Sequence, residues 1–270
     1  MVSLLVLVLV LLIFSLKDDL SRWSLKNAYM KVEDACHEEE IEYTYYTVSE
    51  AEKQTLDKTS FWNREDIDWE KEFPSLSNSQ IEKVRKLVQW TTPITPFGPK
   101  DCREYLIQYQ EAGQEDVKSI MEALPVDWNH EALRYLLWRL DSAFFSQTQV
   151  EEELQEEGYN REQIAYAMEH CGVDWQGQAD GALQIHAIDA GESERQMLRR
   201  MVAWGYTEQQ ARAAIDKAKV DFNRQALIAA EFIQITNKKC QHRVEMCREL
   251  LSYGFTREQA EYAVDQLHYN

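Results

Sequence analysis

The strongest constraint on the fold of this 270-residue chain is a repeat in its second half. Three segments share the pattern Gly, Tyr or Phe, Asn or Thr, two polar residues and Gln. They begin at Gly158, Gly205 and Gly254, and a weaker copy surrounds Gly113. The four glycines are 45, 47 and 49 residues apart. A period of this length predicts a row of small helical units and not one large core.

Local signals in each copy predict two helices around the glycine. The first helix is expected to end at the Gly, because Gly adopts the left-handed C-cap conformation at least cost. The second is expected to begin two residues later with a capping box, formed by Asn160, Thr207 or Thr256 with a Gln three residues beyond. Apolar residues then recur at i, i+3 and i+4, the spacing of one buried helix face.

A Val-Asp-aromatic triplet follows in two copies and in the weaker one, where its Asp is Asp127, and predicts the start of a third helix. The Asp is expected to be the N-cap and the aromatic residue to pack inward. The predicted fold class is therefore mainly α, with tandem small three-helix bundles of a helix-turn-helix or ubiquitin-associated type after an N-terminal hydrophobic helix. Such residues serve folding, so we expect partner-binding residues at exposed positions outside the signature, which the pattern does not identify. The structural repeat signature comprises Gly158, Tyr159, Asp174, Trp175, Gly205, Tyr206, Asp221, Phe222, Gly254 and Phe255.

The N-terminus begins with a run dominated by Leu, Val and Ile, from Val2 to Phe14, which Lys17 ends. A run of this length suits the apolar part of a signal peptide better than a full membrane span, which needs roughly 17 to 25 residues. No Lys or Arg precedes it, so either the true start lies upstream or the segment is a short membrane anchor. A buried helix of a soluble domain is the alternative. With an anchor, the bulk of the chain is expected outside the cell.

The region between this run and the repeats matches no named pattern. Ser79 and Glu82 form a predicted capping box that opens a helix to about Trp90. Three prolines after it predict an extended linker. The predicted segments are a signal or membrane anchor at 1–16, an unassigned juxtamembrane region at 17–100 with a Pro-rich linker at 92–100, a degenerate helical repeat at 101–143, repeats at 144–190 and 194–236, and a C-terminal partial repeat at 243–270.

The net charge and the cysteine spacing limit the kinds of partner and site that we expect. The net charge is −18, and residues 101–270 hold 17 basic and 30 acidic residues. Proteins gain affinity for nucleic acid by neutralising phosphates, so no nucleic-acid partner is expected. No Cys-x-x-Cys pair occurs, and the cluster from Cys240 to Cys247 around His242 fits no common zinc spacing. We therefore expect no metal, no cofactor and no catalytic residue, and hence a protein that is not an enzyme. The five cysteines are Cys36, Cys102, Cys171, Cys240 and Cys247.

The repeat resembles a known family. The pattern Gly-Tyr/Phe-Asn/Thr-Arg-Glu-Gln-x-x-Tyr-Ala, followed by Cys-Gly-Val-Asp-Trp at 171–175 and Asn-x-x-Ala-Leu, is similar to the helical repeat of phage-type host cell surface-exposed lipoproteins (the Ltp type). The resemblance covers roughly residues 101–270. It implies a membrane-anchored, outward-facing protein. Family members of phage origin block superinfecting phages by interfering with DNA entry, and the implied protein partner is the phage tape-measure protein. No lipobox Cys follows Phe14, so a plain anchor is expected in place of a lipid.

Ubiquitin-associated domains provide the alternative interpretation. They are also three-helix bundles with a Gly-Phe/Tyr loop, which Trp204-Gly205-Tyr206 resembles. In that family the loop and the last helix bind ubiquitin, which would make this chain an intracellular adaptor. The Val-Asp-Trp and Cys-Gly elements, together with the apolar N-terminus, favour the surface-lipoprotein family.

Overall fold

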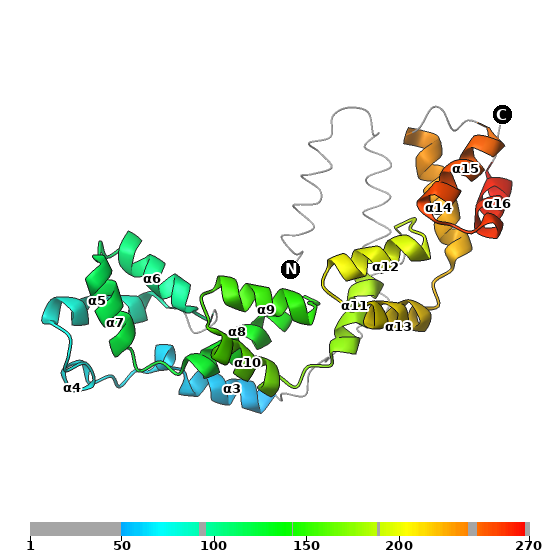
Figure 1. Ribbon diagram of the computed structural model, residues 1–270. Helices are drawn as coiled ribbons and strands as arrows, with labels where there is room; N and C mark the ends of the chain where they lie inside the picture. The colour runs from blue at the N-terminus through cyan, green and yellow to red at the C-terminus, as the bar shows by residue number, and fades with distance from the viewer. Residues whose placement is uncertain (1–49, 92–95, 142, 188–189, 237–241, 268–270) are drawn as a thin grey trace. The chain divides into compact units, whose positions relative to one another are not determined.

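The computed structural model describes residues 50–91, 96–141, 143–187, 190–236 and 242–267 (Figure 1). Every described residue belongs to one compact unit, Thr44–Asn270. The predicted hydrophobic helix and anchor at 1–16 therefore lie outside the described residues. Among the helices that are described, none is long and apolar enough to cross a membrane.

The described residues are mainly helical, as predicted, and contain no β-strand. Six of their helices (α5, α9, α10, α12, α13 and α16) open with a capping box in which Ser, Thr or Asn pairs with Gln. The elements are α3 (Glu50–Thr59), the 3-10 helix η1 (Phe61–Asn63), α4 (Trp69–Glu72), α5 (Asn78–Trp90), α6 (Pro99–Gln108), α7 (Gln114–Ala123), α8 (Trp128–Leu140), α9 (Gln147–Glu156), α10 (Arg161–His170), α11 (Trp175–Ala187), α12 (Glu194–Ala203), α13 (Glu208–Ala218), α14 (Phe222–Thr236), α15 (Arg243–Tyr253) and α16 (Arg257–Gln266).

The first core lies where α5, α6 and α7 contact one another. Leu87, Leu106 and Ile120 are fully buried in it, one from each helix. Part of the predicted linker at 92–100 contributes to this packing, because residues 96–99 are buried and Pro99 is the first residue of α6. Proline suits that position, since the first helical N–H has no partner within the helix.

Two local predictions are wrong. The N-cap of α5 is Ser77 and not Ser79, because Gln80 accepts a hydrogen bond from the Ser77 backbone N–H (2.9 Å) and completes the box. Gly113 does not end α6 in the left-handed conformation; its φ is −68°, and it is the N-cap of α7. The left-handed residue of this loop is Glu111, with a φ of 50°. The loops therefore recur at 111, 158, 205 and 254, with spacings of 47, 47 and 49 residues.

Three further cores each combine three consecutive helices, which we call the α8–α10, α11–α13 and α14–α16 groups (Figure 1). The helix predicted to be third in one repeat packs mostly with the first two helices of the next repeat. In α11, for example, Ala179 and Leu183 are buried in the core that α12 and α13 complete. The predicted boundaries follow the sequence period, whereas the packed groups are displaced from them by one helix.

This displacement can be tested with two substitutions in α11. Leu183 is buried, whereas Ile185 is 65% exposed. Leu183→Ala should lower the free energy of unfolding by about 2–5 kcal/mol, because it leaves a cavity in the core. Ile185→Ala, the control, should change it by less than about 0.5 kcal/mol. Hydrogen exchange should show the loss of protection in α12 and α13; a loss confined to α9 and α10 would contradict the observed grouping.

Candidate functional site

Three glycine loops hold six of the ten signature residues. Gly158, Gly205 and Gly254 have φ values of 87°, 86° and 99°, in the left-handed region that ends a helix. The N–H of the aromatic residue after each Gly donates to a carbonyl five residues earlier, at 3.1 to 3.2 Å. The aromatic side chains then anchor each loop in a core, and all three are 3% exposed: Tyr159, Tyr206 and Phe255.

The remaining signature residues begin the helices that two groups share. Oδ1 of Asp174 accepts from Gln176 N at 3.1 Å, and Oδ1 of Asp221 accepts from the backbone N–H two residues on at 3.0 Å. Both carboxylates therefore cap the first turn of their helices. Trp175 and Phe222 are partly buried and pack against the group that precedes them, α8–α10 and α11–α13 respectively.

A serine at the start of one helix holds the glycine loop of the next group. Ser146, the N-cap of α9, donates from Oγ to Trp204 O at 2.6 Å. Ser193, the N-cap of α12, donates in the same way to Tyr253 O at 2.7 Å. In both cases the acceptor directly precedes the loop glycine. The loops of Gly205 and Gly254 are therefore contacted by the group before them.

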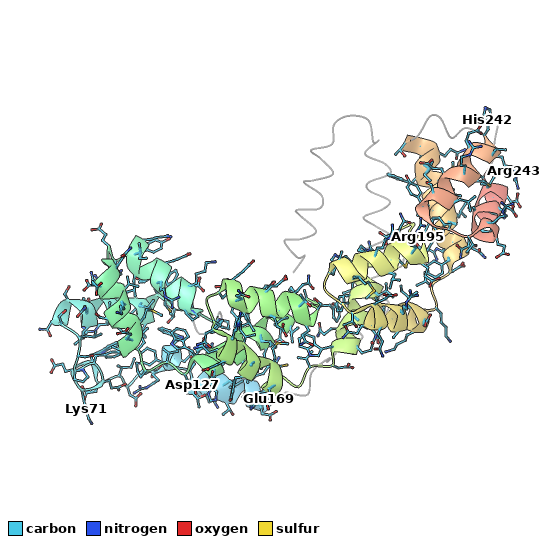
Figure 2. The ribbon with its side chains drawn as sticks, viewed as in Figure 1. Lys71, Asp127, Glu169, Arg195, His242 and Arg243 are labelled. Atoms are coloured by element: carbon cyan, nitrogen blue, oxygen red, sulfur yellow. The ribbon has the colours of Figure 1, made fainter. Side chains whose placement is uncertain are left out.

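Two further side chains contact the backbone of the same glycine loops. Thr148 Oγ1 donates to Gly205 O at 3.2 Å, and Arg195, labelled in Figure 2, donates from Nη2 to Ser252 O at 2.9 Å. A Cβ on Gly205 would lie 2.5 Å from Ser146 Oγ, closer than real side chains approach. Glycine is thus required at this position for its backbone conformation and for the space it leaves.

A buried glutamine attaches each shared helix to the group before it. Gln178 in α11 and Gln225 in α14 both stand four residues after the Asp N-cap, and both are buried. Gln178 Oε1 accepts from Phe145 N at 3.0 Å, and Gln225 Oε1 accepts from Gly191 N at 2.8 Å. These N–H groups lie one and two residues before the serine N-caps of α9 and α12, where the glutamine of the shared helix supplies their acceptor.

In α8 the equivalent position holds Glu131, which is 1% exposed. Its carboxylate accepts from Ser60 Oγ and from Arg134 Nη1, both at 2.6 Å. Arg134 Nε also donates to Asp57 Oδ1 at 2.8 Å, so the network reaches α3. Burial raises the pKa of Glu131 above its ordinary value, although Arg134 and the Ser60 hydrogen bond act to lower it. The ionised carboxylate therefore depends on Arg134.

Large apolar side chains are exposed at positions that recur with the repeat. Ile185 in α11 and Phe232 in α14 are 65% and 64% exposed and stand 47 residues apart. Val202 and Leu251 are 45% and 41% exposed, and each stands three residues before a loop glycine. Single exposed apolar residues are normal on protein surfaces. Recurrence at the same repeat position makes these four residues candidates for contact with a partner.

The described thiols lie in environments that hold them protonated. Burial raises the pKa of Cys102, Cys171 and Cys247 above the ordinary value. Thiolates are the nucleophilic form, so these thiols are poor nucleophiles at neutral pH. The described ranges contain no group of three or more His, Cys, Asp or Glu that could hold a metal ion. Cys36 and Cys240 lie outside those ranges, and the absence of an enzymatic site stays a prediction.

The sequence pattern does not predict several of the residues that make these contacts. Ser146 and Ser193 are 47 residues apart, as are Gln178 and Gln225. The period was therefore visible at these positions. Nothing in one sequence says that a serine or glutamine is buried against a neighbouring group, so the period alone does not predict these contacts.

The double requirement for Gly205 predicts a large effect of a single methyl group. Gly205→Ala should lower the free energy of unfolding by about 1–3 kcal/mol, because Ala is strained at positive φ and its Cβ meets Ser146. Gly113→Ser is the control, since nothing lies within 4 Å of a Cβ there and its φ is −68°. It adds an N-cap hydroxyl and should be neutral or stabilising by a few tenths of a kcal/mol. Equal thermal stabilities of the two variants would contradict the loop assignment.

The Glu131–Arg134 pair predicts a pH-dependent effect. Arg134→Met should destabilise the protein by about 3–5 kcal/mol at neutral pH, because it leaves the Glu131 carboxylate buried without its cation. The folded-state pKa of Glu131 is raised, so the folded protein binds its proton more tightly than the unfolded chain does. Arg134 acts to lower this pKa, so its removal should raise the pKa further; the cost should therefore be full above the pKa of Glu131 in the variant and shrink as the pH falls from there toward the wild-type value. Arg212→Met, which removes an exposed pair with Glu208, should cost no more than about 1 kcal/mol. Urea unfolding at neutral and acidic pH measures both; a cost for Arg134→Met that does not change with pH would refute this account.

Comparison with protein-family models, with curated proteins and with solved structures finds no match for this chain. The roles given to the residues above therefore rest on the contacts and burial within this chain. The resemblances to surface-exposed lipoproteins and to ubiquitin-associated domains stay hypotheses from the sequence.

Proposed function

We propose that this protein is a membrane-anchored array of four three-helix units that binds another protein. The units would be α5–α7, α8–α10, α11–α13 and α14–α16. The cores and the helix contacts within each group support this division. The left-handed residue between the last two helices of each unit, at 111, 158, 205 and 254, supports it independently.

The observation that carries the binding function is the recurrence of exposed apolar residues. Ile185 and Phe232 occupy the same position in two successive shared helices, and both are about two-thirds exposed. A partner that contacts several units would bury such residues together. Repeat proteins bind extended partners in this way, because each unit presents the same kind of surface.

The apolar run from Val2 to Phe14 supports an anchor and a cell-membrane location with the described helices outside the cell. With the Ltp-type resemblance, it makes superinfection exclusion, through a phage protein such as the tape-measure protein, the specific role to test. The charge of −18 speaks against a nucleic-acid partner.

The alternative of a ubiquitin-binding adaptor has less support. The loop that resembles the ubiquitin-binding loop carries Tyr206, which is buried. Ser146 and Thr148 of the preceding group contact the backbone of this loop. A ligand would have to displace these contacts before it could bind there.

Photo-crosslinking in bacteria during phage infection tests the proposal. The crosslinker p-benzoylphenylalanine would replace Ile185 or Phe232, and the exposed Glu231 of α14 would be the control position. We expect a defined adduct from the first two positions and none from the third, with the protein in the membrane fraction. A phage protein in the adduct would support exclusion. The same products from all three positions, or none from Ile185 and Phe232, would refute the array as a binding surface.

A further inference from the structure

A groove of about 490 Å³ lies where α6 and α7 meet the Gly158 loop. Its apolar part includes Val117 and Met121 of α7, Trp128 at the start of α8, and Ile107 of α6, which is 52% exposed. The absent side chain of Gly158 lets the loop lie close to the start of α6, since a Cβ there would lie 3.2 Å from the backbone N of Lys100. The volume falls within the range of ligand sites in proteins.

The charges of the groove contrast with those of the chain. Arg103 and Lys118 line it together with one acidic residue, Glu122, in a protein of net charge −18. Both cations are exposed, and neither forms an ion pair or a hydrogen bond with the residues that the structure describes. Cations beside an exposed apolar surface favour a ligand with a carboxylate next to an apolar group.

Polar groups at the edge of the groove suit a peptide backbone. Gln163 uses Oε1 to accept from Asn160 N at 2.8 Å, which leaves its Nε2 as a donor. Gln114, the first residue of α7, adds a second amide to the lining. Amides of this kind can bind the carbonyl and N–H groups of an extended peptide.

The equivalent positions at the next two junctions carry different side chains. Arg103 and Ile107 are the fifth and ninth residues of α6, where α9 has Glu151 and Gln155 and α12 has Leu198 and Val202. Lys118 is the fifth residue of α7, where α10 has Ala165 and α13 has Arg212. The cationic and apolar combination therefore comes from variable positions, while Gly158 and Trp128 belong to the repeated framework.

We propose that this groove binds a short acidic segment of a partner protein, in which an Asp or Glu flanks a large apolar residue. The apolar side chain would pack on Ile107, Met121 and Trp128, and the carboxylate would pair with Arg103 and Lys118. This inference rests on the proposed function, because it names one surface of the array and the class of partner sequence that the surface selects.

Selection of random peptides displayed on phage against the full chain in detergent micelles tests the groove. We expect enrichment of peptides with Asp or Glu beside Leu, Ile, Phe or Trp, and weaker binding as salt rises. A triple variant, Arg103→Glu, Ile107→Gln and Lys118→Ala, installs the residues of the next junction. It should weaken binding of the selected peptides by about tenfold or more with little change in thermal stability. Glu151→Gln, the matched control at the next junction, should leave their binding unchanged.

The outcomes separate this groove from the proposed function. Peptides without acidic residues, equal binding to the triple variant, or single-stranded DNA that binds with the same dependence on Arg103 would overturn the groove assignment. Self-association lost in the triple variant, seen by light scattering, would identify a second copy as the occupant and also overturn it. Failure here with adducts retained at Ile185 and Phe232 would leave the array as a binding surface intact.

Discussion

The arrangement of the described helices depends on a helix that two cores share. In α11 the first residue, Trp175, packs on the α8–α10 core, while Ala179 and Leu183 enter the α11–α13 core. The same division recurs in α14, where Phe222 packs on the preceding core. A helix whose side chains pack into two small cores couples them, so neither core has to supply all the stability of a separate domain. This reduces the stability that each group of three short helices has to supply by itself.

The polar contacts at each junction follow from that shared helix. Its Gln178 or Gln225 supplies the acceptor for a backbone N–H that precedes the neighbouring helix. The serine cap on the other side accepts an N–H of its own helix and donates its hydroxyl hydrogen to the next loop, so one residue serves both groups. In α8 the position of the buried glutamine is taken by Glu131. Its buried carboxylate accepts hydrogen bonds from Arg134 and Ser60. Each junction is thereby specified by polar groups that would be costly to leave unpaired.

Much of the local structure could be predicted from the sequence, and the grouping of helices could not. Gly158 ends a helix through its own backbone conformation, and Asp174 caps one by accepting from a backbone N–H two residues on. Both effects are local, so the sequence pattern alone locates them. A periodic sequence, however, has no marked origin, and the same period is compatible with three choices of first helix. Gly113 differs from the prediction because a glycine can also be an N-cap, while Glu111 occupies the left-handed position without a sequence signal. The groove escaped prediction because Arg103, Lys118 and Trp128 meet only after two groups have packed.

The contacts at the junctions also determine which side chains can differ between repeats and so give specificity for a partner. Glycine, serine, glutamine and the capping aspartate each satisfy a geometric demand of the framework. The fifth and ninth residues of the helix before each loop make none of these junction contacts, and they change from Arg103 and Ile107 to Glu151 and Gln155 and then to Leu198 and Val202, of which Leu198 packs against the α11–α13 core. Substitutions at the exposed positions among them, such as Arg103, Ile107 and Val202, alter charge and apolar surface with little effect on the cores. A chain built in this way can present a different binding surface at each junction while the packing of its helices stays the same. Selectivity for a partner would then depend on the side chains outside the repeat signature.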